Sequence, residues 1–253
     1  MKEHKASVQK ELIGEKSASQ KYRELFIGRS GLWSFIQYEL IVLLFSWVPG
    51  ALGIFMRKIF YPLLFQRVGK GVAFGHHITI RHPHKISIAD NSFIDDYSVL
   101  DAKGDDNEGI RIGKNSYIGR NTTLSCKGGS IFLGDYSNIS ANCSLLSETI
   151  IEVGAYTFLA GHCYLVAGGN HRFDRTDIPI MLQPSLDRGG IRIGDDCWLG
   201  ASVVVLDGIN IEKGSVIGAG AVVNKSLPEY SIAVGVPARK VKQRNKSGQG
   251  HHS

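Results

Sequence analysis

A histidine in the longest irregular stretch of the sequence is the side chain best suited to carry chemistry. His171 lies in the segment from Ala167 to Gly190, directly after Asn170 and three residues before Asp174. An imidazole can remove a proton from a hydroxyl near neutral pH, which turns that oxygen into a nucleophile. A loop of this length is rarely idle in a compact domain. His171 is therefore the leading candidate for a general base, and Asn170 and Asp174 are candidates for contacts with the second reactant.

The elements that must position this loop follow from a six-residue repeat of apolar residues. Aliphatic or aromatic anchors recur every six positions in groups of three, and the residue two before an anchor is usually small. Helical periodicity does not produce a strict six, whereas a short strand followed by a corner does. The anchors are Val68, Phe74, Ile80; Ile88, Ile94, Leu100; Ile112, Ile118, Leu124; Leu133, Ile139, Leu145; Val153, Leu159, Leu165; Ile193, Leu199, Val205; and Ile211, Ile217, Val223.

The insertions between the groups locate one corner of a three-sided prism. Spacing within a group is always six, while between groups it is 8, 12, 9, 8, 28 and 6, so every insertion leaves the same corner. Glycine makes up 30 of 253 residues and often follows an anchor, where we expect corners to need unusual backbone angles. Cys143, Cys163 and Cys197 stand two before an anchor, which predicts that these thiols pack inside the prism.

The repeat is the hexapeptide signature of a parallel β-helix. Over about residues 68–241 the chain resembles the hexapeptide-repeat acyltransferases, above all sugar O-acetyltransferases of the galactoside, maltose, capsule and O-antigen type. The resemblance is carried by Asn170-His171, by the coil Ile193-Gly-Asp-Asp-Cys-Trp-Leu-Gly-Ala201 and by Gly235-Val-Pro-Ala-Arg239. It implies an all-β fold, a left-handed parallel β-helix of about seven coils with an N-terminal helical, apolar segment and a short C-terminal extension. It further implies a homotrimer with active sites between subunits.

The resemblance also implies a site for acetyl-CoA as acyl donor, and no metal. Trp198, Gly200 and Ala201 would lie beside the pantetheine arm and thioester, and Gly218 and Ala219 along the pantetheine and adenine path. Asn224 and Lys225 would follow, with Asn224 in place of the family's usual threonine. Arg239 and Lys242 would pair with the CoA phosphates through charge-assisted contacts.

A column of corner residues has two interpretations. Asn121, Asn142 and His162 stand three residues after a middle anchor, and asparagine tolerates corner geometry, which favours a structural ladder. The functional interpretation places Asn142 or His162 beside an acceptor sugar. Trp198 lies one before an anchor and so faces outward, in a column with Phe93, Tyr117 and Phe158 that would serve assembly, CoA contact or both.

The sequence before Val68 is of a different kind, so we divide the chain into residues 1–67, 68–242 and a flexible tail, 243–253. Residues 1–21 are polar, and we expect no signal peptide. The apolar stretch Leu40–Met56 is broken at Pro49-Gly50 and is at the short limit for a membrane span. It predicts either two short packed helices or a hairpin at the inner face of the cytoplasmic membrane, through residues 31–66; a true span ranks third.

Composition and motifs help to decide between the remaining candidate functions. The net charge is +6, but no zinc-finger, RNA-recognition or helix-turn-helix signature occurs, so we expect a cytoplasmic protein that binds no nucleic acid. Alternatives to sugar O-acetylation are N-acetylation of an amino sugar, a non-catalytic scaffold, and a metal lyase of the γ-carbonic-anhydrase type. The last would use His77, His82 and His84, but it needs a further histidine on the next coil, where Tyr97 stands.

Overall fold

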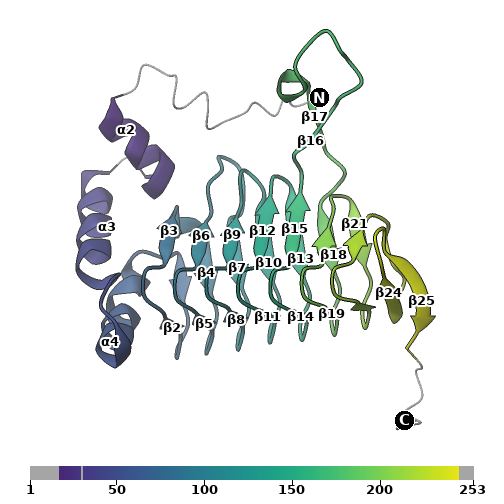
Figure 1. Ribbon diagram of the computed structural model, residues 1–253. Coiled ribbons are helices and arrows are strands. Elements are labelled where there is room, and N and C mark those ends of the chain that lie inside the picture. The colour runs from purple at the N-terminus through teal and green to yellow at the C-terminus, as the bar shows by residue number, and fades with distance from the viewer. Residues whose placement is uncertain (1–16, 30, 245–253) are drawn as a thin grey trace.

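The structure is a computed structural model that describes residues 17–29 and 31–244. Its main body is a three-sided prism of parallel strands, with helices at the N-terminal end and a long loop standing out from one corner (Figure 1). Most of the predicted tail, from residue 245 on, lies outside the described residues. The helices are α2 (Ala18–Tyr22), η1 (Arg23–Ile27), α3 (Leu32–Phe45), α4 (Gly50–Phe60), η2 (Tyr61–Leu63) and η3 (Pro83–Lys85).

Each face of the prism is one sheet, to which every coil contributes one strand. Sheet A contains β1 (Arg67–Val68), β4 (Ile86–Ile88), β7 (Ile110–Ile112), β10 (Ser130–Leu133), β13 (Ile150–Val153), β18 (Ile191–Ile193) and β21 (Ile209–Ile211). Sheet B contains β2 (Ala73–Phe74), β5 (Phe93–Ile94), β8 (Tyr117–Ile118), β11 (Asn138–Ile139), β14 (Phe158–Leu159), β19 (Trp198–Leu199), β22 (Val216–Ile217), β24 (Ser231–Val234) and β25 (Arg239–Gln243). Sheet C contains β3 (Thr79–Arg81), β6 (Val99–Asp101), β9 (Thr123–Ser125), β12 (Ser144–Ser147), β15 (Tyr164–Ala167), β20 (Val204–Val205) and β23 (Val222–Val223).

The predicted parallel β-helix is confirmed, and it is slightly longer than expected. Within the described residues there are seven complete coils, and an eighth begins where Leu227 forms a bridge to Ile211 and β24 continues sheet B. The short C-terminal extension is β25, which pairs antiparallel with β24 and ends the sheet. Every insertion leaves the corner between sheets C and A, as the spacing of the anchors predicts.

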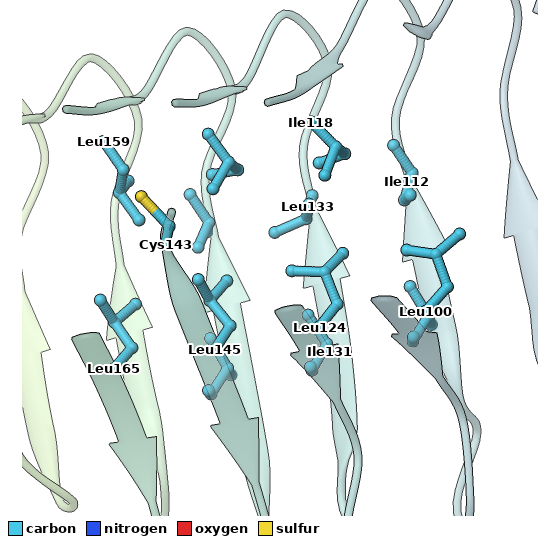
Figure 2. Packing of buried hydrophobic residues seen from close by; sticks show 14 of the residues in the cluster. Leu100, Ile112, Ile118, Leu124, Ile131, Leu133, Cys143, Leu145, Leu159 and Leu165 are labelled. Atoms are coloured by element: carbon cyan, nitrogen blue, oxygen red, sulfur yellow. The ribbon is translucent and has the colours of Figure 1, made fainter. Parts of the chain in front are cut away.

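The anchors stack in register and form the core (Figure 2). Leu145, for example, pairs with Leu124 on one side and Leu165 on the other, and all three are fully buried. Burying an aliphatic side chain of this size contributes about 1.5–3 kcal/mol, and the prism repeats that gain on every face of every coil.

The small partners of the anchors satisfy backbone groups inside the prism. Ser92 Oγ donates to the carbonyl of Gly113 at 2.8 Å, and Thr157 Oγ1 donates to that of Gly194 at 2.8 Å. Cys163 fills the same kind of position and donates its thiol to the carbonyl of Gly200 at 3.3 Å. Buried polar groups need partners, and here each finds one on the next coil. The buried cysteines therefore pack as predicted.

The glycines that follow the anchors were expected to provide unusual backbone angles, but they have a different role. A Cβ on Gly113 would lie 2.5 Å from the carbonyl carbon of Gly134, so glycine permits neighbouring coils to approach closely. The unusual backbone angles occur instead at the third residue after first and middle anchors, as at Asn142 (φ 60°) and His162 (φ 64°). This geometry supports the structural interpretation of the Asn121, Asn142 and His162 column.

The apolar stretch folds into two helices, α3 and α4, which pack on the first coil, as the packed-helix interpretation expects. Tyr38 on α3 donates its hydroxyl to the carbonyl of Ile80 at 2.6 Å. Arg57 on α4 is buried and donates to the carbonyls of Phe74, Phe45 and Val48 at 2.7–3.0 Å. In the part of the chain that the structure describes, neither helix is long and apolar enough to cross a bilayer.

The histidines considered for zinc have other roles. His77 is exposed at a corner and stacks on Tyr97, whereas His82 is buried and its Nε2 lies 2.8 Å from the carbonyl of Glu24. Among residues 17–29 and 31–244, no three His, Cys, Asp or Glu side chains are grouped to hold a metal ion. The metal-lyase alternative therefore finds no support in the fold.

Two histidines lie where the helical cap meets the first coil, and their protonation is opposed by their surroundings. The rings of His82 and His84 stack at 5.9 Å between centroids. Burial lowers the pKa of both imidazoles, that of His84 to about 4, and the positive charge of Arg29 adds to the effect on His84. The folded chain therefore disfavours protonation of both rings, and His84 stays neutral down to about pH 4.

We predict that replacing an inward leucine destabilises the prism far more than replacing its outward neighbour. Leu145→Ala removes a fully buried anchor and should lower the free energy of unfolding by about 2–5 kcal/mol. Leu146→Ala is the matched control, because Leu146 is the next residue on β12 and is only half-buried. Chemical denaturation measures both, and equal losses would contradict the inward-outward register.

We also predict that the fold loses stability as the pH falls from about 6.5 toward 4. An unfolded histidine has a pKa near 6.5, so in this window the unfolded chain binds protons that the folded chain does not. Urea unfolding at pH 7 and pH 4.5 should show this loss, and His84→Gln should make it smaller, with His82 still contributing. An identical pH dependence in wild type and His84→Gln would contradict the assignment.

Candidate active site

The long loop between β15 and β18 contains a small hairpin that the sequence did not predict. β16 (Asn170–His171) pairs antiparallel with β17 (Ser185–Leu186), and a short helix, η4 (Ile180–Leu182), lies between them. Figure 1 shows this loop standing out from the corner between sheets C and A. His171 is thus held on a paired strand rather than on an irregular tip.

A backbone carbonyl fixes the orientation of the His171 ring. His171 Nδ1 lies 3.2 Å from the carbonyl oxygen of Gln183. Because a carbonyl only accepts hydrogen bonds, Nδ1 carries the hydrogen and Nε2 keeps its lone pair. Gln183 is itself buried, and its side chain donates to the carbonyl of Arg175 at 2.7 Å, which ties the loop together. The free Nε2 is the form a general base requires.

A buried carboxylate holds the base of the loop. Asp207 accepts hydrogen bonds from the Asn170 side chain at 2.7 Å, the Gly190 amide at 3.0 Å and the Arg188 amide at 3.3 Å. Asp207 was not predicted from the sequence, although a signal existed: it occupies an inward column two residues after a third anchor. The second to fifth coils place small residues there, namely Ala102, Cys126, Ser147 and Ala167.

The residues matched to the CoA path line the edge between sheets B and C. Gly200 and Ala201 occupy this corner of the sixth coil, and Gly218 and Ala219 occupy it in the seventh. The coils meet closely here, since a Cβ on Gly200 would lie 2.6 Å from the Ala219 amide nitrogen. Trp198 borders the corner on sheet B, is 52% exposed and pairs with Phe158. We call this row of small residues, Gly200, Ala201, Gly218 and Ala219, the track. Trp198 borders it on sheet B.

Four polar residues of the predicted CoA site lie at the C-terminal end of the prism. Arg239 and Lys242 are exposed on β25. The chain reaches that strand through Ala238, whose amide bonds to the carbonyl of Val222 at 2.8 Å beside the track. Asn224 and Lys225 are also exposed, but they follow β23 and so lie at the opposite edge of sheet C.

The four acceptor candidates divide between the two edges of sheet C. Asn142 and His162 are exposed at the B–C corner of the fourth and fifth coils, in line with the track. Asn170 lies on the loop, with its amide committed to Asp207. Asp174 lies farther along the loop and forms an exposed ion pair with Arg172 at 3.0 Å.

A single chain therefore does not bring the base and the track together. The segment that contains β20 runs from Ala201, which belongs to the track, to Asp207, which anchors the loop of His171. Six residues of extended chain separate them, roughly 15–20 Å with allowance for the corner. A site that uses both edges requires the track of one copy beside the loop of another.

Comparison with known proteins identifies the repeat. Residues 109–147 and 190–225 match the family model described as the hexapeptide repeat of succinyl-transferase. A probable acetyltransferase of Mycobacterium tuberculosis (strain ATCC 25618 / H37Rv) is 37% identical over 138 residues, covering 54% of this chain and 45% of that protein. The chain spans about half the length, 45% and 47%, of the first two curated relatives it matches.

A further relative and a solved structure cover more of their own length. The putative lipopolysaccharide biosynthesis O-acetyl transferase WbbJ of Escherichia coli (strain K12) is 31% identical over 143 residues, 54% of this chain and 72% of that protein. A mutant of AntD, an N-acyltransferase from Bacillus cereus, in complex with dTDP-4-amino-4,6-dideoxyglucose and coenzyme A, is similar at a TM-score of 0.51. It is 26% identical and covers 74% of this chain and 88% of that one. With its repeat, its fold and these relatives, the chain belongs to the hexapeptide-repeat acetyltransferases.

Proposed function

We propose that the chain is an acetyl-CoA-dependent O-acetyltransferase that transfers an acetyl group to a hydroxyl of a sugar or surface-glycan precursor. The observation that carries the proposal is the contact between His171 Nδ1 and the carbonyl of Gln183, which leaves Nε2 as a proton acceptor. A base in this tautomer, on a loop that Asp207 anchors, is suited to activate a hydroxyl.

The proposed reaction is a direct acyl transfer. His171 Nε2 takes the proton of the acceptor hydroxyl while the oxygen attacks the acetyl carbon of the thioester. The new C–O bond forms, and the C–S bond then breaks as the tetrahedral intermediate collapses. The imidazolium returns its proton to the departing sulfur, so the products are an acetyl ester and CoA, and the histidine is again neutral.

The track between sheets B and C is the proposed place of the donor. Its exposed small residues, Ala201 and Ala219, together with Gly200 and Gly218, present no bulky side chain to a pantetheine arm that runs along the coils. Trp198 provides an apolar wall beside the thioester. Arg239 and Lys242 offer positive charge to the CoA phosphates. Asn224 and Lys225 lie at the other edge of sheet C, so within one chain they are apart from this track. The coenzyme A bound by AntD supports this choice of donor.

The acceptor class rests on the relatives and on the candidate residues. WbbJ is named for lipopolysaccharide biosynthesis and O-acetyl transfer, which supports a glycan hydroxyl as the acceptor. Asn142, His162, Asn170 and Asp174 are the residues we propose to lie around it. AntD, an N-acyltransferase with an amino sugar nucleotide bound, gives the competing assignment, an amine acceptor.

We also propose an oligomeric state and a cellular location for the protein. Because one chain separates His171 from the track, we propose a homotrimer in which each site combines the loop of one subunit with the track of its neighbour. Residues 68–242 form the catalytic domain, and residues 1–67 form an N-terminal segment whose described part, residues 17–29 and 31–67, caps it. We place the protein in the cytoplasm, with residues 31–66 in peripheral contact with the membrane that carries the glycan precursor.

We predict that His171→Ala lowers the turnover number by roughly 10²–10⁴-fold, because the acceptor hydroxyl loses its base. The measurement is the release of CoA from acetyl-CoA with a panel of sugars and glycan oligosaccharides. His77→Asn is the matched control: it replaces an exposed histidine on the first coil with a residue that tolerates its corner geometry. Unchanged turnover in His171→Ala would contradict the role of His171.

The same panel decides between hydroxyl and amine acceptors. Each sugar is offered in competition with its amino-sugar analogue, and the acetylated product is tested with mild alkali, which cleaves an ester and leaves an amide intact. We expect alkali-labile products. Preferential formation of an alkali-stable amide would replace the O-acetyl assignment with N-acetylation.

We predict that Arg239→Ala and Lys242→Ala each weaken acetyl-CoA binding by roughly ten- to a hundredfold, since a charge-assisted contact contributes about 1.5–3 kcal/mol. The KM for the acceptor should stay unchanged. Lys240→Ala is the matched control, because it removes the same charge from the same strand where Lys240 bonds to Gln243. Isothermal titration with CoA measures the effect, and equal affinity in all three variants would place the phosphates elsewhere.

A further inference from the structure

One end of the molecule exposes an apolar surface that the acyl-transfer chemistry does not use. The helices α3 and α4 lie across the N-terminal end of the prism (Figure 1). They and the short segments that follow each of them display large apolar side chains that are 37–74% exposed. We call this surface the cap face: Leu32, Trp33, Ile36, Leu40, Leu43, Leu44, Trp47, Leu52, Ile54, Phe55, Ile59 and Leu63. Large apolar side chains exposed in this number on two neighbouring helices mark an interaction site.

The positive charge of the chain is concentrated beside the cap face. Residues 17–70 contain seven Lys and Arg against two Asp and Glu, a net charge of +5 out of +6 for the whole chain. Residues 71–244 contain 17 basic and 18 acidic residues, a net charge of −1. Arg29, Lys58, Arg67 and Lys70 are exposed around the helices. The partner of an apolar surface with a basic margin should be apolar with an anionic margin.

The cap is rigidly mounted on the prism. Arg57 reaches from α4 to the carbonyl of Phe74 on the first coil and to two carbonyls at the end of α3. Gly53 lets α4 approach the carbonyl of Val48 so closely that any side chain there would collide with it. Helices of 14 and 11 residues are roughly 21 and 17 Å long, well short of the ~30 Å hydrocarbon core. Neither helix is therefore long enough to span a bilayer.

We infer that the cap face docks on an anionic phospholipid membrane, with its apolar side chains at the level of the acyl-chain boundary. Trp33 and Trp47, 74% and 58% exposed, are the residue type that membrane interfaces favour. A symmetric contact with the cap of a second copy would bring two segments of net charge +5 together, whereas anionic headgroups neutralise them. This inference specifies the membrane contact of the proposed function, and it holds whichever acceptor is used.

The three tryptophans of the chain make the docking measurable. Trp33 and Trp47 lie on the cap, while Trp198 is on the sixth coil, five steps of about 4.8 Å or roughly 24 Å beyond the first. Vesicles that contain phosphatidylglycerol with brominated acyl chains quench only nearby indoles. The full chain with Trp198→Phe should lose most of its fluorescence on these vesicles, and Trp33→Phe/Trp47→Phe should keep it. Equal quenching of both, or of neither, would overturn the inference.

A second pair of variants tests the surface itself. Leu43→Glu/Phe55→Glu places two charges on the cap face and should reduce sedimentation with phosphatidylglycerol vesicles at least tenfold. Ile180→Glu/Leu182→Glu is the matched control, since it makes the same change on exposed residues of the loop and should bind as wild type. Neutral phosphatidylcholine vesicles should bind more weakly than anionic ones.

The remaining outcomes are also decisive. If Leu43→Glu/Phe55→Glu changes the oligomeric state in lipid-free buffer and the wild type does not bind vesicles, a second copy covers the cap face and the inference is wrong. Acetyl transfer to a water-dissolved acceptor should be the same in wild type and Leu43→Glu/Phe55→Glu, so failure of membrane docking and failure of the proposed function are read separately.

Discussion

Each coil of the prism must lie directly on the next, at about 4.8 Å, with its backbone hydrogen bonds in register. This stacking decides which residues the chain can use. Anchors such as Leu145 fill the interior, and hydroxyls and thiols on their small partners bond to the neighbouring coil. Glycines such as Gly113 permit the close approach at the edges. Catalytic and ligand-binding side chains can therefore lie only at the corners, on the outer faces and in the insertions.

This constraint explains how the site is divided. Insertions leave only the corner between sheets C and A, so His171 and its loop belong to that edge. The corner between sheets B and C carries the track of small residues, Gly200, Ala201, Gly218 and Ala219. The width of sheet C keeps the two apart in one chain. The side-by-side assembly that we propose would place the base of one copy beside the donor track of the next.

The sequence predicted the parts of the structure that repeat, and it failed where contacts are local and unrepeated. The anchors, the inward cysteines and the corner of the insertions follow from a period of six, which any slip of register would destroy. The hairpin of Asn170 and His171 and the Gln183 carbonyl depend on contacts across a loop, which leave no periodic trace. Asp207 stands in a periodic inward column, but the loop groups that it binds do not repeat. The glycine pattern was recognised, but its cause, contact between coils, required the structure.

The central claim is that the loop of one copy and the track of the next form one site, and complementation between two inactive variants tests it most directly. His171→Ala removes the base, and Ala201→Trp blocks the track at an exposed corner position. Co-expressed in one cell with different affinity tags, the two should form mixed oligomers that regain acetyl transfer, because some sites combine an intact loop with an intact track. Mixed oligomers as inactive as either parent would contradict the account.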